Sequence, residues 1–227
     1  MRRPVGGLSG HSRKGVNNMG FTLTKTKAKT DSSLDNILKK TATFHGHLCP
    51  GTVIGTRMAL AGLREIGITD PEGSQQKDYM VYVETDRCPI DAISVVSGAR
   101  ISRRSLKFLD WGKVAATFVN TKNGKAVRIV CPDSARELVD NYVSGEYQVD
   151  KHGKDAREVD AYKVMPEKEL FIITSVKVDN YKFSKEKFKV QCENCGETVN
   201  DHKEVVVDGK VMCRSCGGEG KSYYNAL

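Results

Sequence analysis

The sequence predicts a mixed α/β fold of the α+β kind, followed by a small C-terminal module. Segments with helical spacing alternate with short strand-like runs, without a strict β-α-β rhythm, and one pair of strands reads as a hairpin. The last 46 residues hold four of the seven cysteines. No stretch approaches the roughly 18 apolar residues of a membrane-spanning helix. We therefore expect a soluble protein that has no membrane partner.

The first half of the core is predicted to be helical, with one central break. Asp31, Ser32 or Ser33 can cap a helix whose apolar positions follow helical spacing; they are Leu34, Ile37, Leu38 and Thr41. Residues 44–51 then predict a break, and residues 52–66 predict a second helix that ends near Gly67. A strand is expected over 79–85 and a short helix over 89–97.

The second half is predicted to contain a hairpin. Residues 114–120 and 125–130 flank Asn123-Gly124, a dipeptide typical of tight turns between antiparallel strands. The remaining elements are expected as helices over 132–143 and 155–164 and a strand over 170–178. Together these segments define a core domain over 31–181.

The charge is unevenly distributed. The formal net charge of +8 consists of +7 in residues 1–30, zero in 31–181 and +1 in 182–227. Residues 1–30 therefore read as a basic, disordered tail, and a nucleic-acid-binding arm is the alternative. A folded nucleic-acid surface is disfavoured, because the basic excess lies in the tail. The tail has no apolar h-region, and seven cysteines without a secretion signal favour the cytoplasm.

Residues 182–227 predict a separate module held by a metal. Its cysteines have the spacing C-x2-C-x17-C-x2-C, which is typical of structural zinc sites; they are Cys192, Cys195, Cys213 and Cys216. Asp208-Gly209 predicts a hairpin that returns the second pair to the first, and Gly196 and Gly217 follow each pair. Two disulfides, two redox dithiols or an iron site are the alternatives.

The core holds a second group of possible ligands. His45, His47 and Cys49 alternate, so in an extended segment they would point to one side. Cys49 and Cys88 each precede a proline and a predicted helix, and a helix N-terminus favours the thiolate. Cys88, with Asp86 and Asp91 nearby, could complete the set.

Two histidines with one or two cysteines suit zinc or a similar transition metal, with one position left for a substrate. We therefore take His45, His47, Cys49 and Cys88 as candidate catalytic residues and His47, Cys49 and Cys88 as ligands of a second metal. The alternative is that the histidines bond to backbone and the cysteines are buried. Cys131, which also precedes a proline, is interpreted as structural.

At these residues the chain resembles the FmdE family, which is named after one component of formylmethanofuran dehydrogenase. The resemblance rests on residues 44–51, on Cys88-Pro89-Ile90-Asp91-Ala92-Ile93 with Gly98, on residues 110–115 and 165–171, and on the four-cysteine end. It implies an α/β core, a treble-clef or zinc-ribbon-like finger, an intertwined homodimer and a cleft lined by the histidine–cysteine residues. The family's namesake is a molybdenum or tungsten one-carbon redox complex, so other subunits of such a complex are expected partners.

One segment departs from that family. Where its members often have Gly-Cys-Thr-x-Gly-Lys, this chain has Gly98-Ala99-Arg100-Ile101-Ser102-Arg103. The lost cysteine and the added arginines predict either an anion site or a solvated turn.

Three functions remain open at this point. The first is a metal-binding accessory or enzyme-like protein of one-carbon redox chemistry. The second is a dimeric scaffold that docks a partner through the finger, and the third is a zinc-ribbon nucleic-acid binder that uses the tail.

Overall fold

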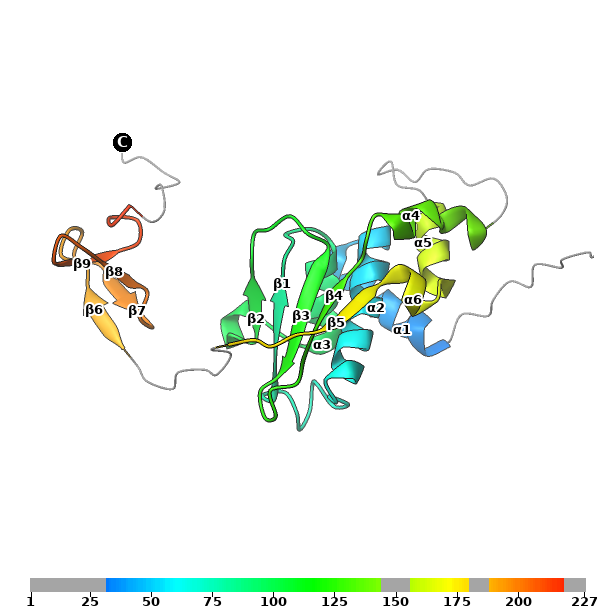
Figure 1. Cartoon of the computed structure of the whole chain (residues 1–227), viewed down its shortest axis with the longest axis horizontal. Helices are drawn as coiled ribbons and strands as arrows, with labels where there is room; N and C mark the ends of the chain where they lie inside the picture. Colours follow the sequence, from blue (N-terminus) through cyan, green and yellow to red (C-terminus); the bar gives the residue numbers. More distant parts are fainter. Residues whose placement is uncertain (1–31, 144–155, 180–187, 219–227) are drawn as a thin grey trace, which may run out of the picture.

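The computed structural model describes residues 32–143, 156–179 and 188–218, which form a core and a small C-terminal finger (Figure 1). The predicted tail over 1–30 lies outside the described residues, and so does most of the segment that joins core and finger. None of the described helices combines the length and the apolar character that crossing a lipid bilayer requires.

The core is built on one five-stranded mixed sheet with the order β2-β1-β3-β4-β5. β1 pairs with β2 in parallel, and the other neighbours are antiparallel. The strands are β1 (Tyr79–Val83), β2 (Leu106–Phe108), β3 (Ala115–Asn120), β4 (Ala126–Val130) and β5 (Ile172–Ser175). This sheet confirms the mixed α/β prediction, and the hairpin at Asn123-Gly124 joins β3 to β4 with Gly124 at φ 77°.

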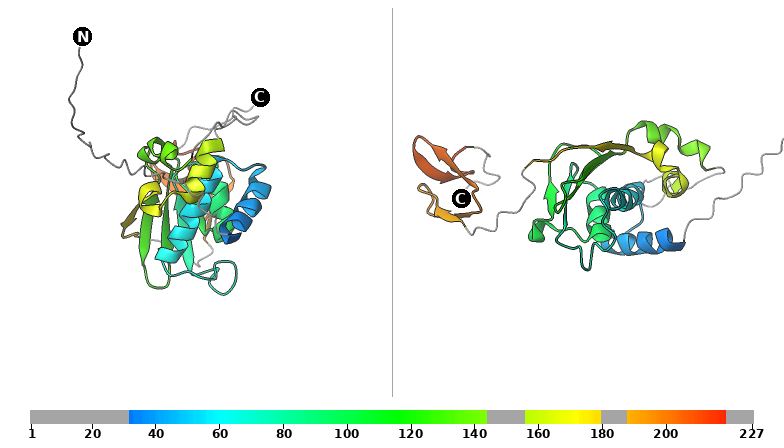
Figure 2. Two further views of the ribbon diagram at one scale, coloured as in Figure 1. Left: turned by 90° about the vertical axis from the view of Figure 1, so that its right-hand side faces the viewer. Right: turned by 60° about the horizontal axis from the view of Figure 1, so that its bottom comes forward.

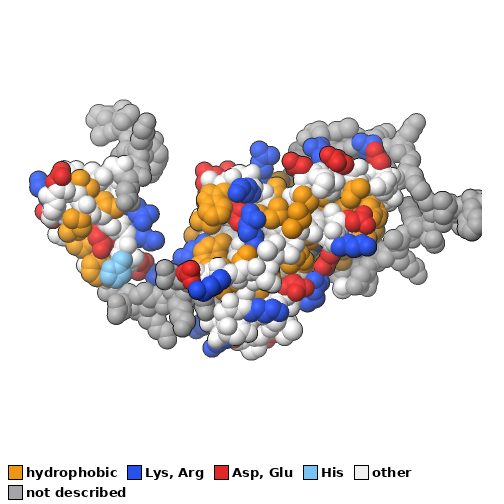
Figure 3. Space-filling model, in the orientation of Figure 1, with side chains coloured by type: hydrophobic (Ala, Val, Ile, Leu, Met, Phe, Trp, Pro, Cys, Tyr) orange, Lys and Arg blue, Asp and Glu red, His pale blue; other side chains and the backbone are white. Residues whose placement is uncertain are grey.

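Three helices form two further layers on one face of the sheet (Figure 2). α2 (Pro50–Glu65) and α3 (Pro89–Ser97) lie next to the sheet, and α1 (Ser32–His45) packs on the outside of both. The hydroxyls of Thr41 on α1 and Thr56 on α2 are 3.2 Å apart in this buried contact. None of the described helices lies on the other face of the sheet, where hydrophobic side chains reach the surface between lysines and arginines (Figure 3).

Glycines allow the helices to pack closely. A Cβ on Gly51 would lie 2.8 Å from the Cβ of Cys88, and one on Gly55 would lie 2.6 Å from the carbonyl oxygen of Pro89. Both distances are shorter than nonbonded atoms tolerate, so a side chain at either glycine would push α3 away from α2. The start of α3 is therefore held against the start of α2.

Smaller elements complete the core; the helix predicted over 155–164 is confirmed, whereas two other segments differ from the predictions. These smaller elements are η1 (Ile101–Arg103), α4 (Ser134–Glu137), η2 (Val139–Asn141), α5 (Ala156–Val164) and α6 (Glu167–Leu170). The single helix predicted over 132–143 is wrong, because the amides of Asn141 and Tyr142 bond to carbonyls three residues back, which makes a separate 3-10 turn after α4. Pro166 starts α6, which shortens the predicted strand 170–178 to β5. The three-residue β2 was not predicted, because so short a run has no readable period.

The finger contains two small antiparallel sheets. β6 (Lys189–Gln191) pairs with β7 (Thr198–Asn200), and β8 (Glu204–Val207) pairs with β9 (Lys210–Cys213). Asp208 and Gly209 have φ values of 50° and 78°, which are typical of the predicted two-residue hairpin turn. Each sheet leads into or out of a Cys-x2-Cys turn, as in a zinc ribbon.

Candidate metal centres

The four cysteines of the finger converge on one point. Their sulfurs, from Cys192, Cys195, Cys213 and Cys216, all lie within 4.8 Å of one another. Sulfurs bound to one tetrahedral zinc ion at about 2.3 Å would be roughly 3.8 Å apart, so the cluster fits zinc with little movement. Because all four positions of the tetrahedron are taken by protein sulfurs, an ion here supports the fold and has no place for a substrate.

Backbone amides stabilise negative charge at this cluster. The amides of Cys195 and Cys213 lower the pKa of the Cys192 thiol to about 6 against the effect of burial. In spite of the Glu197 amide, Cys192 raises the pKa of Cys195 to about 12. The amide of Cys216 donates to the sulfur of Cys213 at 3.4 Å, and the side-chain amide of Asn194 donates to the sulfur of Cys216 at 3.2 Å. Such donors favour thiolate, the form that binds a metal.

The glycines after each cysteine pair are explained by two different constraints. Gly196 has φ 73°, which an L side chain adopts with strain, and thus fits the predicted permissive backbone. Gly217 is required for space instead: a Cβ there would lie 2.2 Å from the Cγ2 of Val205, and the positive φ belongs to Gly218. Both turns close alike, with amide-to-carbonyl bonds of 2.8 Å from Gly196 to Cys192 and from Gly217 to Cys213.

In the core, His45, Cys49 and Cys88 form the second cluster. One ligand atom from each lies within 4.8 Å of the other two. His45 ends α1, whereas Cys49 and Cys88 stand directly before Pro50 of α2 and Pro89 of α3. Three helix ends thus supply the three groups, and the glycine-mediated approach of α2 and α3 brings the two cysteines together.

The local conformation around His45 differs from the prediction. The segment 45–49 is not extended, because α1 continues through His45, and the amide of Gly46 still donates to the carbonyl of Ala42 at 2.8 Å. Gly46 then turns the chain with φ 95°. The predicted extended conformation of this segment is therefore wrong at His45, although the rings of His45 and His47 still lie close together.

His47 lies beside the cluster. Its ring centroid is 4.9 Å from that of His45, at an interplanar angle of 38°. Among the described residues, the group whose ligand atoms come together contains His45 and not His47. The ligand role predicted for His47 therefore stays a prediction, and His45 occupies the better position for it.

Asp91 holds the His45 ring in place. Its Oδ2 is 2.7 Å from Nδ1 of His45, and the histidine side chain is 14% exposed. A carboxylate that accepts the Nδ1 proton leaves the Nε2 lone pair for a metal, which is the usual support of a histidine ligand. Asp91 lies three residues after Cys88, on the first turn of α3. The start of α3 therefore supplies both the candidate ligand Cys88 and the carboxylate that holds His45.

Cys131 lies outside both clusters found among the described residues. Burial raises the pKa of its thiol to about 12, and Asp133 adds to this effect. Its amide donates to the carbonyl of Val114 at 2.9 Å, just after β4. A buried thiol kept protonated is a poor ligand and a poor nucleophile.

Sequence reasoning missed the residues that bring the core cluster together but are not themselves candidate ligands. Gly51 and Gly55 were not singled out, although glycines four residues apart on a helix can indicate a close helix contact. Asp91 was noticed for its proximity in sequence, but its partner His45 lies 46 positions away. No local pattern reveals such a pairing.

Comparisons with known proteins agree with these two parts. Residues 44–172 match the family described as "FmdE, Molybdenum formylmethanofuran dehydrogenase operon". Residues 186–219 match the prokaryotic dksA/traR C4-type zinc finger. The first match includes all three residues of the core cluster, and the second includes all four cysteines of the finger.

Two individual proteins are similar to this chain. A probable S-adenosyl-L-methionine-binding protein of Archaeoglobus fulgidus is 30% identical over an alignment of 213 residues, which covers 87% of this chain and 56% of that protein. The chain thus spans about half the length of that relative.

The second is a solved structure, a tungsten formylmethanofuran dehydrogenase FmdE-like protein from Syntrophus aciditrophicus. It is similar in fold, with a TM-score of 0.56 at 20% identity, over 85% of this chain and 95% of that one. With the match over residues 44–172, the chain belongs to the FmdE family and carries a C4-type zinc finger after its FmdE domain.

Proposed function

We propose that this protein binds two metal ions of different roles and acts in a one-carbon redox system of the formylmethanofuran dehydrogenase type. The observation that carries the proposal is the meeting of His45, Cys49 and Cys88 within 4.8 Å at three helix ends. Three protein donors of this kind leave one position of a tetrahedral ion for a substrate or water. The finger, in contrast, binds a structural zinc.

The residues of the core site have separate tasks. Cys49 and Cys88 bind the ion as thiolates at two helix starts, where the helix dipoles favour negative charge. His45 is the third ligand, in place of the His47 of the sequence prediction, and Asp91 fixes its ring. A bound divalent ion would polarise an oxygen atom of a substrate. His47, beside His45, is then positioned to exchange a proton with a bound molecule.

Metal content per chain tests this proposal. We expect two ions in the wild-type protein and one in both Cys49→Ala and Cys88→Ala, with an unchanged circular dichroism spectrum. Cys131→Ala is the matched control, since Cys131 also precedes a proline but lies outside the cluster, and it should retain two ions. Equal metal content in the wild type and both cluster variants contradicts the core metal site.

We also propose a homodimer, which in turn docks onto other subunits of a redox complex. Large apolar side chains that are exposed in the single chain support it: Trp111 is 58% exposed, Ile172 55% and Phe108 42%. Such residues commonly mark contact surfaces. Light scattering on a purified sample should give twice the mass of the chain, and a mass of 25.1 kDa contradicts the dimer.

The Archaeoglobus relative supports a second candidate function, the binding of S-adenosyl-L-methionine. That name belongs to a protein of which this chain matches 56%. Calorimetric titration with S-adenosyl-L-methionine tests it, with S-adenosyl-L-homocysteine as the uncharged-sulfur control. Heat of binding that saturates at one ligand per chain supports this candidate, and none at all removes it.

A further inference from the structure

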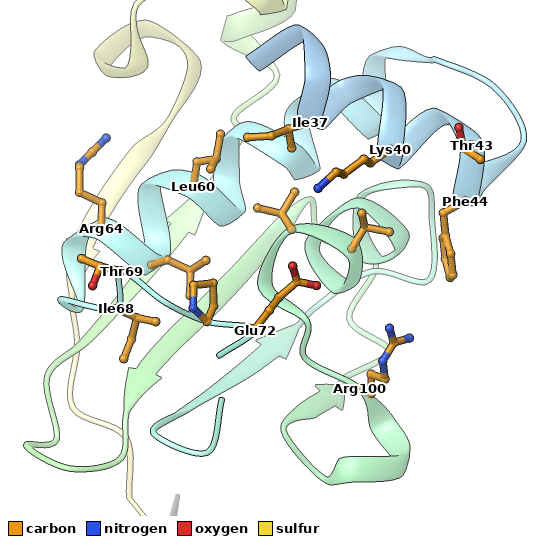
Figure 4. Close-up of a pocket in the computed structure, with 14 residues that line it drawn as sticks. Ile37, Lys40, Thr43, Phe44, Leu60, Arg64, Ile68, Thr69, Glu72 and Arg100 are labelled. Carbon is orange, nitrogen blue, oxygen red and sulfur yellow. The ribbon is translucent and has the colours of Figure 1, made fainter. Parts of the chain in front are cut away.

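A groove separate from both metal centres lies on the helical side of the core (Figure 4). It has a volume of about 690 Å³, within the range typical of sites for small organic ligands. Its wall comes from α1, α2, α3 and the loop after α2. The lining residues are Ile37, Lys40, Thr43, Phe44, Leu60, Leu63, Arg64, Ile68, Thr69, Pro71, Glu72, Val95, Val96 and Arg100.

The body of this groove is apolar. Leu63 and Ile68 are almost fully buried beneath it, whereas Leu60 and Val95 are only half-buried and face the space. Phe44, at the end of α1, is 57% exposed. Aliphatic side chains left partly exposed in a concave surface gain free energy when an apolar molecule covers them.

The charges at the groove favour an anion. Arg64 is already paired with Glu65 and Glu167, at 3.0 Å and 2.8 Å. The other charged lining residues are two cations, Lys40 and Arg100, and one carboxylate, that of Glu72. Lys40 and Glu72 point into the groove from opposite sides (Figure 4). Arg100 belongs to the stretch that departs from the family pattern.

Glu72 lies next to Gly98, at the C-terminal end of α3, and its side chain is exposed. Its Cγ is 3.3 Å from the place where a Cβ on Gly98 would lie. Burial raises the pKa of Tyr79 to about 12, and the Glu72 charge adds to this effect. Glu72 therefore lies on the α3 side of the groove, across from Lys40 on α1 (Figure 4).

The N-terminal residues of this chain are a poor occupant. Residues 1–30 carry seven basic groups and no acidic one, so Lys40 and Arg100 repel them. The charge and the shape instead suit a ligand with a long apolar body and one negative group.

We propose that the groove binds an amphiphilic anion, namely a long-chain carboxylate. Its carboxylate pairs with Lys40, Arg100 adds positive potential, and its chain covers Leu60, Leu63, Ile68 and Val95. This site is independent of both metal centres, because it shares none of their ligand residues.

Calorimetric titration with dodecanoate, below its micelle concentration, tests the site. We expect one ligand per chain, and weaker binding by about tenfold in Lys40→Met, the effect of one lost charge-assisted contact. Glu72→Gln should act in the opposite direction and strengthen binding, because it removes the only carboxylate among the lining residues. Lys39→Met is the matched control: Lys39 is the exposed neighbour on α1 and does not line the groove, so this variant should bind dodecanoate like the wild type.

Two further experiments vary the charge of the ligand's head group and the free volume of the groove. Dodecyltrimethylammonium, of equal chain length and opposite charge, should bind about tenfold more weakly or not at all. Leu60→Trp, at a half-buried position, should fill the groove and abolish binding with an unchanged melting temperature.

Three results overturn the proposal. One is equal affinity for the anionic and cationic amphiphiles, and another is dodecanoate binding that survives Leu60→Trp. The third is no dodecanoate binding while an acidic amphipathic helical peptide binds, which would assign the groove to a protein partner.

Discussion

The two thiol clusters are assembled in opposite ways. In the finger, two Cys-x2-Cys turns and one short hairpin bring four sulfurs together within 25 residues. In the core, His45, Cys49 and Cys88 come from three helix ends, and the packing of α2 on α3 places them. The four cysteines of the finger are therefore brought together by local turns, whereas the three residues of the core cluster depend on helix packing.

The number and the support of the ligands differ accordingly. The finger has four donors and a very small apolar core. In its described part, the buried apolar residues are Cys192 and Val199. The core has three donors and a large hydrophobic cluster around them. If both sites bind metal as proposed, we therefore expect the finger ion to be stabilising and the core ion to be dispensable for folding.

The largest expected effect is that of removing one finger ligand. Cys213→Ser should unfold the finger, because zinc binding supplies on the order of 10 kcal/mol to a module of this kind. Hydrogen exchange should show loss of protection over 188–218 and an unchanged core. The exposed Ser215→Ala, in the same turn, is the control. Protection that persists in Cys213→Ser without metal would point to disulfides or to a finger that needs no ion.

A smaller effect is expected from the support of the core ligand. Asp91→Asn removes the carboxylate at His45 and should weaken metal binding in the core by about ten- to a hundredfold. Competition with a chromophoric chelator measures this affinity, and the finger ion should be unaffected. Asp86→Asn, at an exposed aspartate near the same cysteine, should bind metal normally. If both variants lose the same affinity, general charge rather than the His45 contact is responsible.

Gly55→Ala tests whether helix packing creates the core site. The added Cβ would meet the Pro89 carbonyl oxygen at 2.6 Å, and overpacking of this kind costs about 1–3 kcal/mol. Urea unfolding should show that loss, together with weaker metal binding in the core but not in the finger. Unchanged stability with unchanged metal binding would mean that the α2–α3 contact does not set the position of Cys88.

The smallest effect is expected for His47→Ala. Since His47 lies beside the cluster, the metal content should stay at that of the wild type, whereas His45→Ala should lose the core ion. Element analysis of the two variants side by side distinguishes the neighbouring histidines. Loss of the ion in His47→Ala alone would restore the ligand set predicted from the sequence.

The sequence alone determined the parts of this protein that depend on local patterns. Cysteine spacing identified the finger, the Asn123-Gly124 and Asp208-Gly209 dipeptides marked two hairpins, and the apolar pattern located α1 and α2. These features could be read because each is set within one or two turns of chain, where backbone preferences and nearby ligands decide the conformation.

Only the tertiary structure decided which residues meet in the core. The alternation of His45, His47 and Cys49 suggested an extended segment, yet α1 runs on through His45 and Gly46 turns the chain. The pairing of His45 with Asp91 and the groove beneath Lys40 depend on how α1 packs on α2 and α3. Side-chain volume and missing Cβ atoms set that packing across more than forty residues, a range over which sequence periodicity carries no information.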